Sequence, residues 1–203
     1  MAKHFSEKER AQIIEQLCEI GHKEFTLRGL RAARIEDICR AAGISKGSFY
    51  NFFPAKEQLF LAIIEKREAV HRDKLTRLAQ DFSGKETDLI GVIFDAISSS
   101  IETDPFIAVM MQPGEMEHLA RKIGPEQMAA HQQGDIEFFA SLTADLQTRG
   151  YFKSASPTLI TELSVLVFCT FMQRDLLPKE MFNTSLSHLR DLFQFKLVDK
   201  GGN

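Results

Sequence analysis

The chain has 203 residues and a mass of 23.0 kDa, which suits one domain or a small head on a larger body. Its 44% hydrophobic and 26% charged residues exclude a disordered chain, and three cysteines without a CxxC spacing exclude a disulfide framework and argue against a zinc site. The net charge of −3 is unevenly spread, because residues 23–56 hold seven basic and three acidic residues whereas residues 61–203 hold 15 basic and 20 acidic ones. A basic head on an acidic body is the asymmetry expected if only the head meets phosphate.

The first residues, MAKHFSEKER, are polar and charged, which argues against a secretory signal. The longest strongly apolar run, Val165 to Met172, is much shorter than the roughly 18 residues that a bilayer span needs. We therefore expect a cytoplasmic protein with three reduced cysteines and no membrane partner.

The N-terminal third predicts four helices. Ser6 and Glu9 have the spacing of a capping box, which predicts a first helix, and Gly29 offers a left-handed stop. A short helix is expected to end at Gly43, and Ser45 can cap the next one. Pro54 is expected to open a longer fourth helix.

The rest of the chain also shows the 3.6-residue hydrophobic periodicity of α-helices. Apolar residues recur at helical spacing from Leu89 to Ile101. Asp104-Pro105 and Ser156-Pro157 each combine a cap residue with a proline at the first helical position. No segment shows strand alternation bounded by hairpin turns. The predicted fold class is all-α, with about nine or ten helices.

The segment from Arg34 to Phe60 predicts a helix-turn-helix, with a tight turn at Ala42-Gly43-Ile44. Gly47 in a helix interior costs about 1 kcal/mol against alanine, and close approach to another backbone would offset that cost. Ser45 and Ser48 are short enough to let the second helix enter a major groove, and its N-terminus points free N–H groups at phosphate. The apolar residues spaced to pack the two helices together are Ile35, Ile38, Ala41, Ile44, Phe49 and Phe53.

The run ICRAAGISKGSFYNFFPAKEQL, residues 38–59, resembles the DNA-binding signature of TetR-type transcriptional repressors. The matching elements are the AAGIS turn, a glycine followed by a small hydroxyl residue, the Phe-Tyr pair, the Phe-Phe-Pro step and Lys-Glu-x-Leu at the next helix. The resemblance covers about residues 5–65. It implies a three-helix DNA-binding head at 1–65 and a helical effector-binding and dimerisation domain at 66–203.

The resemblance also implies roles for single residues. Tyr50 would bond a backbone phosphate through its hydroxyl, and Lys56 would meet a phosphate with its ammonium. The family usually has Thr or Ser just before its second helix, where this chain has Ala33-Arg34, so the cap is lost although Arg34 could supply the phosphate contact. The predicted DNA-binding residues are Arg34, Ser45, Lys46, Gly47, Ser48, Tyr50, Asn51 and Lys56.

Two apolar C-terminal segments look like the helix pair that builds a four-helix dimer interface in that family. A dimer is also what a palindromic operator requires, because two recognition helices must meet major-groove faces about 34 Å apart. The alternative is one thick monomeric core. The predicted interface residues are Leu159, Leu163, Leu166, Phe171, Leu186, Leu189 and Phe193.

The resemblance implies an effector pocket in the larger domain, and methionines adapt to varied apolar ligands. Apolar residues at helical spacing can equally be core, so this alternative stays open. The candidate pocket residues are Phe94, Ile97, Ile101, Phe106, Met110, Met111, Met116, Phe138, Phe139, Leu142, Phe168 and Met172.

The function implied is that of a homodimeric, ligand-responsive repressor, released from a palindromic operator on double-stranded DNA by a small apolar molecule. One alternative is an effector- or partner-binding module without specific DNA binding, and another is a redox sensor acting through Cys39. His118 and His131 have no partner at ligand spacing and are expected at the surface. No catalytic constellation stands out, so we expect no enzyme activity, no cofactor and no metal site.

Overall fold

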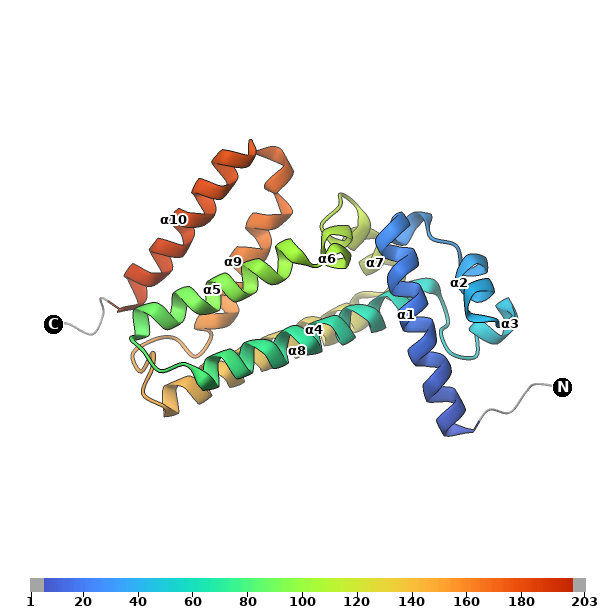
Figure 1. The fold of residues 1–203 in the computed structure, drawn as a ribbon, viewed down its shortest axis with the longest axis horizontal. Helices are drawn as coiled ribbons and strands as arrows, with labels where there is room; N and C mark the ends of the chain where they lie inside the picture. The colour runs from blue at the N-terminus through green and yellow to red at the C-terminus, as the bar shows by residue number, and fades with distance from the viewer. Residues whose placement is uncertain (1–5, 199–203) are drawn as a thin grey trace. The chain divides into compact units, whose positions relative to one another are not determined.

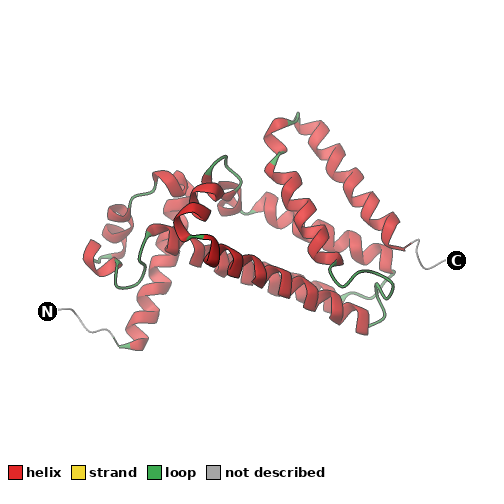
Figure 2. Cartoon of the chain, turned by 180° about the vertical axis from the view of Figure 1, so that it is seen from behind, coloured by secondary structure: helices red, strands yellow, loops and turns green. Residues whose placement is uncertain are grey.

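The computed structural model describes residues 6–198, and the side chains of residues 6–195. Within this range the chain forms ten α-helices and one short 3-10 helix, with no strand (Figures 1 and 2), which confirms the predicted all-α class and helix number. No helix among these residues has the length and apolar character needed to cross a bilayer. The helices are α1 (Glu7–Ala32), α2 (Ile35–Ala42), α3 (Lys46–Phe49), α4 (Lys56–Asp81), α5 (Glu86–Thr103), α6 (Pro105–Met110), α7 (Glu115–Ile123), α8 (Pro125–Thr148), α9 (Leu159–Met172), η1 (Arg174–Leu176) and α10 (Lys179–Val198).

Local capping signals set three boundaries in the first helices, namely the start of α1, the end of α2 and the start of α3. The Ser6 hydroxyl accepts the N–H of Glu9 and the Glu9 carboxylate accepts the N–H of Ser6, so the predicted capping box is present. Gly43 ends α2 in the left-handed conformation, with φ 66° and ψ 25°. Gly29 interrupts α1 with φ 79° and ψ 163°, so the predicted break occurs there although the backbone is not left-handed helical.

Proline positions were a less reliable guide. Pro105 and Pro125 do open α6 and α8. However, α4 begins at Lys56 rather than at Pro54, and α9 begins at Leu159 rather than at Pro157. In the second case the Ser156 hydroxyl accepts the N–H of Thr158 at 3.2 Å, so it stabilises a turn instead of capping the helix.

The chain divides into two compact units. The first comprises the residues up to Glu68 together with Pro105–Met128, and the second comprises Ala69–Asp104 together with the residues from Ala129 onwards. Helices α6 and α7 therefore belong to the same unit as α1, α2 and α3. The functional division into 1–65 and 66–203 stays a prediction.

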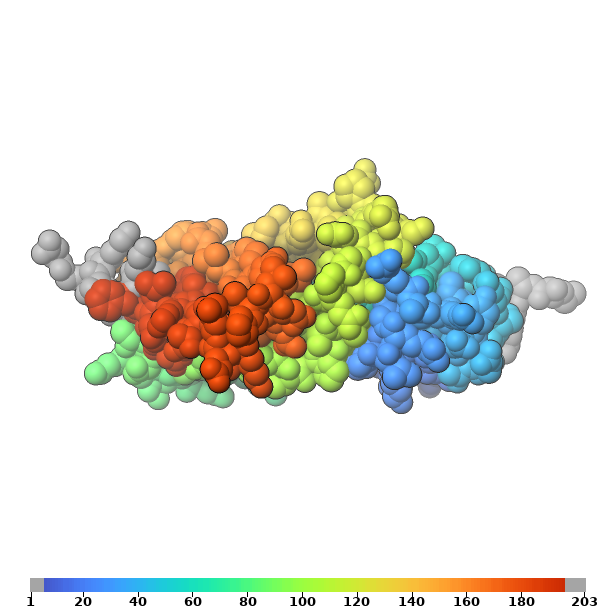
Figure 3. All heavy atoms as spheres, turned by 90° about the horizontal axis from the view of Figure 1, so that it is seen from above, coloured from blue at the N-terminus to red at the C-terminus, as the bar shows by residue number. Residues whose placement is uncertain are grey.

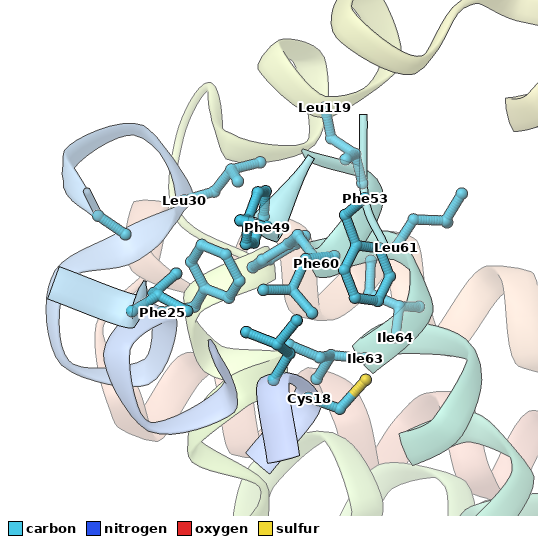
Figure 4. Packing of buried hydrophobic residues seen from close by; sticks show 14 of the residues in the cluster. Cys18, Phe25, Leu30, Phe49, Phe53, Phe60, Leu61, Ile63, Ile64 and Leu119 are labelled. Carbon is cyan, nitrogen blue, oxygen red and sulfur yellow. The ribbon is translucent and has the colours of Figure 1, made fainter. Parts of the chain in front are cut away.

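Aromatic rings fill the core of the first unit. The fully buried ring of Phe60 in α4 meets Phe25 of α1 edge-on at 5.1 Å and Phe106 of α6 at 4.8 Å, measured between ring centroids. Phe49 of α3 is also fully buried and lies 6.0 Å from Phe53 (Figure 4). Since full burial of one such side chain is worth about 1.5–3 kcal/mol, this cluster fixes α3 and α4 against α1.

In the second unit, α5 packs against both α9 and α10. The Arg190 guanidinium of α10 holds the Asp95 carboxylate of α5 through two hydrogen bonds of 2.7 and 2.8 Å. On the apolar side, Phe171 of α9 meets Phe182 of α10 edge-on at 5.2 Å. Seen from above, α9 and α10, coloured orange to red, form a continuous part of the surface of this unit (Figure 3).

Candidate nucleic-acid interface

The helix-turn-helix consists of α2, the turn at Gly43 and the single-turn helix α3. Ser45 caps α3 by accepting the N–H of Ser48 at 3.0 Å, as the sequence predicts. The two serine hydroxyls also lie 2.9 Å apart. Phe49 points into the core, so the other side chains of this helix remain on its outer face.

Most residues predicted to bind DNA lie on α3 or next to it along the chain, whereas Arg34 precedes α2 and Lys56 begins α4. The backbone at Gly47 is open, since a Cβ built there would meet no atom nearer than the Ser45 hydroxyl, at 3.8 Å. Packing within the protein therefore does not require glycine at this position. Arg34, Ser45, Lys46, Gly47, Tyr50 and Asn51 are exposed, whereas Ser48 and Lys56 are half-buried.

Tyr50 ends α3 and presents its ring to solvent. The ring packs edge-on against Phe49 at 5.6 Å, and 47% of the residue stays exposed. This contact orients the Tyr50 ring while leaving about half of the residue accessible to a ligand. Arg34 precedes α2 without a side-chain capping bond, which confirms that the cap usual at this position is lost.

Arg10 of α1 supports the end of α3, and the sequence analysis did not identify it. Its Nη1 donates to the Asn51 carbonyl at 3.0 Å, and its guanidinium lies 5.2 Å from the centroid of the Phe52 ring. No local pattern could have revealed this contact, because the two residues are 41 positions apart.

The Lys46 ammonium donates to the Glu36 carboxylate at 2.6 Å. This hydrogen bond lowers the pKa of Glu36 from its ordinary value and raises the pKa of Lys46. Both groups are therefore charged at neutral pH. The pair links the first turn of α2 to the first residue of α3.

Lys56 lies at a different place, which we call the α1–α4–α7 junction: Arg31, Ala33, Lys56, Glu57, Glu115 and His118. Its ammonium donates to the carbonyls of Arg31 and Ala33, both at 2.9 Å. Burial lowers the pKa of Lys56. Two of the three N–H donors thus satisfy carbonyls at the end of α1, and one is left for another partner.

Two buried acidic side chains complete the junction. Glu115 at the start of α7 accepts the N–H of Arg31 at 3.2 Å, close to the break at Gly29. Glu57 lies 3.0 Å from Nε2 of His118. The expectation that His118 lies at the surface is therefore wrong, because its side chain is only 17% exposed and meets the buried Glu57. His131 in the second unit is half-buried.

The candidate pocket residues are divided between the two units. Phe106, Met110, Met111 and Met116 belong to the first unit, where Phe106 is fully buried between Phe60 and His22. The other eight belong to the second unit, in which Phe94, Ile101 and Leu142 are buried. The candidate pocket residues therefore form two separate sets, one in each unit.

The predicted interface residues also fall into two classes. Leu159, Leu163 and Phe171 are buried inside the second unit, so their side chains have no surface left for a partner. Leu166 is 48% exposed, and Leu186, Leu189 and Phe193 are half-buried. Other exposed apolar residues in or between the two apolar C-terminal segments are Val165, Leu176, Met181, Leu192 and Phe195.

The cysteines differ in accessibility. Cys18 and Cys39 are buried and Cys169 is exposed. Burial raises the pKa of the Cys39 thiol, which disfavours the reactive thiolate. This environment does not favour the redox-sensor alternative at Cys39.

Comparisons with known proteins agree with this geometry. Residues 19–63 match the family model described as bacterial regulatory proteins, tetR family. The HTH-type transcriptional repressor NemR of Escherichia coli (strain K12) is 31% identical over 93 residues, which are 44% of this chain and 43% of that protein. The match thus spans less than half the length of this relative.

Solved structures extend the likeness in fold to nearly the whole chain. A TetR-family transcriptional regulator from Pectobacterium atrosepticum has a TM-score of 0.68 at 16% identity, covering 95% of this chain and 96% of that one. The transcriptional regulator FadR from Bacillus subtilis, solved in complex with stearoyl-CoA, has a TM-score of 0.63 at 12% identity, covering 89% and 97%. Residues 19–63 thus resemble the DNA-binding segment of TetR-type regulators, and nearly the whole chain shares the fold of a solved TetR-family regulator.

Proposed function

We propose that this protein is a sequence-specific DNA-binding repressor. The observation that carries the proposal is the outer face of α3, where exposed polar side chains surround a bare Gly47 while Phe49 anchors the helix from beneath. A helix with short side chains and an open backbone can approach base edges and phosphates closely. Residues 1–65 would carry DNA binding, and residues 66–203 would carry effector binding and dimerisation.

The contacts with DNA divide into two kinds. Tyr50, Arg34 and the remaining N–H of Lys56 would meet phosphates, which position the head without reading sequence. Lys46, Ser48 and Asn51 would lie at or near base edges and phosphates, and their hydrogen bonds to base edges would discriminate between base pairs. Ser45 and Gly47 would let the backbone of α3 come close to the groove.

A palindromic operator calls for two heads, and we propose that a homodimer supplies them. Support comes from exposed apolar side chains on α9 and α10, among them Leu166 and Leu192. Leu166→Lys should shift the protein from dimer to monomer in sedimentation velocity. Leu176→Lys on η1 is the control, because Leu176 is exposed but precedes α10 and is not among the predicted interface residues. If Leu166→Lys stays dimeric, the interface lies elsewhere.

The effector would be a small apolar molecule. Support comes from the buried Phe94, Ile101 and Leu142 of the second unit, and from the FadR relative in fold whose structure holds stearoyl-CoA. Its binding would favour a form in which the two heads cannot engage both half-sites, and such coupling is typically worth about 1–3 kcal/mol.

Selection of random duplex DNA on the purified full chain tests the proposal. We expect a palindromic consensus bound in the nanomolar range at physiological salt. Weak, steeply salt-dependent binding without a consensus would overturn it and favour the alternative of a partner-binding module.

A further inference from the structure

The Glu36–Lys46 ion pair joins an acid to a lysine proposed to lie at or near base edges and phosphates. Its two side chains are each 53% exposed, so the pair lies at the surface together with Ser45 and Asn51. The ammonium of Lys46 therefore already has an anionic partner in the absence of DNA.

A phosphate that approaches α3 meets this pair rather than a free ammonium. For Lys46 to bond the phosphate, the Glu36 carboxylate must be displaced, and it then remains close to the negatively charged backbone. Such a built-in repulsive element lowers affinity for any DNA whose other contacts do not offset the repulsion. A random sequence offers phosphates but few matched base contacts, so little offsets the loss of the Glu36–Lys46 contact.

We infer that Glu36 is a specificity-determining residue, whose carboxylate withholds Lys46 from the phosphates of random DNA. Lys46 exchanges Glu36 for DNA where base contacts of α3 seat the helix fully in the groove. Random-sequence complexes then form without the Lys46 contact, whereas operator complexes include it. The inference rests on the proposed function, because it concerns the same surface.

The neighbouring Asp37 provides a matched control. It lies in the same first turn of α2 and pairs with Arg40 at 3.1 Å, within α2 and without involving α3. Asp37→Asn therefore removes the same charge from nearly the same place but leaves the Lys46 contact intact.

The experiment measures binding of the full chain to a random-sequence duplex and to the selected operator by fluorescence anisotropy over a salt series. With Glu36→Gln we expect affinity for random duplex to rise by about 3- to 10-fold and its salt slope to steepen by about 0.9, the value for one added phosphate contact. The operator slope should stay unchanged, so the ratio of operator to random affinity falls. Glu36→Ala should behave as Glu36→Gln does, and Asp37→Asn should leave the random-duplex slope as in the wild type.

A double-mutant comparison ties the effect to Lys46. In a Lys46→Met background, Glu36→Gln should no longer steepen the random-duplex slope. The inference is overturned if Glu36→Gln leaves that slope unchanged, if Asp37→Asn steepens it equally, or if the effect persists without Lys46. Absence of an operator consensus for the wild type would instead overturn the proposed function, while the random-duplex slopes would still decide the role of Glu36.

Discussion

The outer face of α3 and the α1–α4–α7 junction both carry a lysine that the sequence pattern assigns to DNA, yet the two environments are opposite. Lys46 is exposed and paired with one carboxylate, which another anion can replace. Lys56 is half-buried and donates to two backbone carbonyls, those of Arg31 and Ala33. A basic residue in a DNA-binding motif can thus support the fold as well as bind phosphate, and burial distinguishes the two roles.

The largest effect is expected in the core beneath the junction. Phe60→Ala removes a fully buried ring in contact with Phe25 and Phe106, and should lower the free energy of unfolding by about 3–5 kcal/mol. Urea unfolding followed by circular dichroism measures it. Leu27→Ala in the same unit is the control, because Leu27 is 76% exposed, and it should change stability by no more than about 0.5 kcal/mol. Similar losses in both variants would contradict the core assigned here.

The two lysines themselves give the next contrast. Lys56→Met leaves the Arg31 and Ala33 carbonyls without their donor and should cost about 1–3 kcal/mol of stability. Lys46→Met should cost no more than about 0.5 kcal/mol, because surface ion pairs contribute little. Thermal melting of the two variants beside the wild type measures the difference. Equal melting temperatures would remove the distinction between junction and surface.

A smaller effect, confined to DNA binding, is expected on the outer face. Tyr50→Phe removes the hydroxyl proposed to bond phosphate and should weaken binding to every duplex by about 1 kcal/mol, or roughly fivefold. Asn51→Ala is the companion variant, and should alter sequence preference more than overall affinity. Anisotropy on the operator and on single-base variants separates these outcomes. A loss from Tyr50→Phe that is limited to one base pair would reassign Tyr50 to base recognition.

The smallest expected effect is the pH dependence of the Glu36–Lys46 pair. Because the pKa of Glu36 is lowered in the folded protein, its stabilisation is complete above the ordinary glutamate pKa of about 4.3 and is lost as the pH falls through the lower, folded value. Wild-type stability should therefore fall slightly more on acidification than that of Glu36→Gln. Parallel melting curves of the two proteins between neutral and acidic pH check this, and identical acid profiles would show that the pair does not persist in solution.

Local sequence signals predicted the head better than the rest of the chain. The Ser6–Glu9 box, the Gly43 turn and the Ser45 cap depend on neighbours within a few residues, and each forms as expected. The placement of helix starts at prolines was wrong at Pro54 in the head and again at Pro157, where a serine–threonine turn competes with helix capping. Fixed spacing also made the DNA-binding segment recognisable, because the geometry of a helix-turn-helix tolerates little variation.

Contacts between distant segments could not be predicted in this way. Arg10 bonds Asn51, Glu115 bonds Arg31 and His118 meets Glu57, and none of these pairs has a local pattern. In the larger domain, helical spacing predicted too many interface residues. It identified Leu163 and Leu166 alike, although Leu163 is buried and Leu166 is exposed. Periodicity shows that a residue lies on an apolar face but not which neighbour covers it.

The first unit combines two segments that are distant in the sequence, which affects how it forms during protein synthesis. Phe106 and Glu115 complete its core and its junction, yet they follow the fourth helix by many residues. A ribosome adds about 5–20 residues per second, so α6 starts to emerge about 1–5 s after the end of α4. During that interval the rings of His22 and Phe60 lack the cover that Phe106 provides in the folded unit.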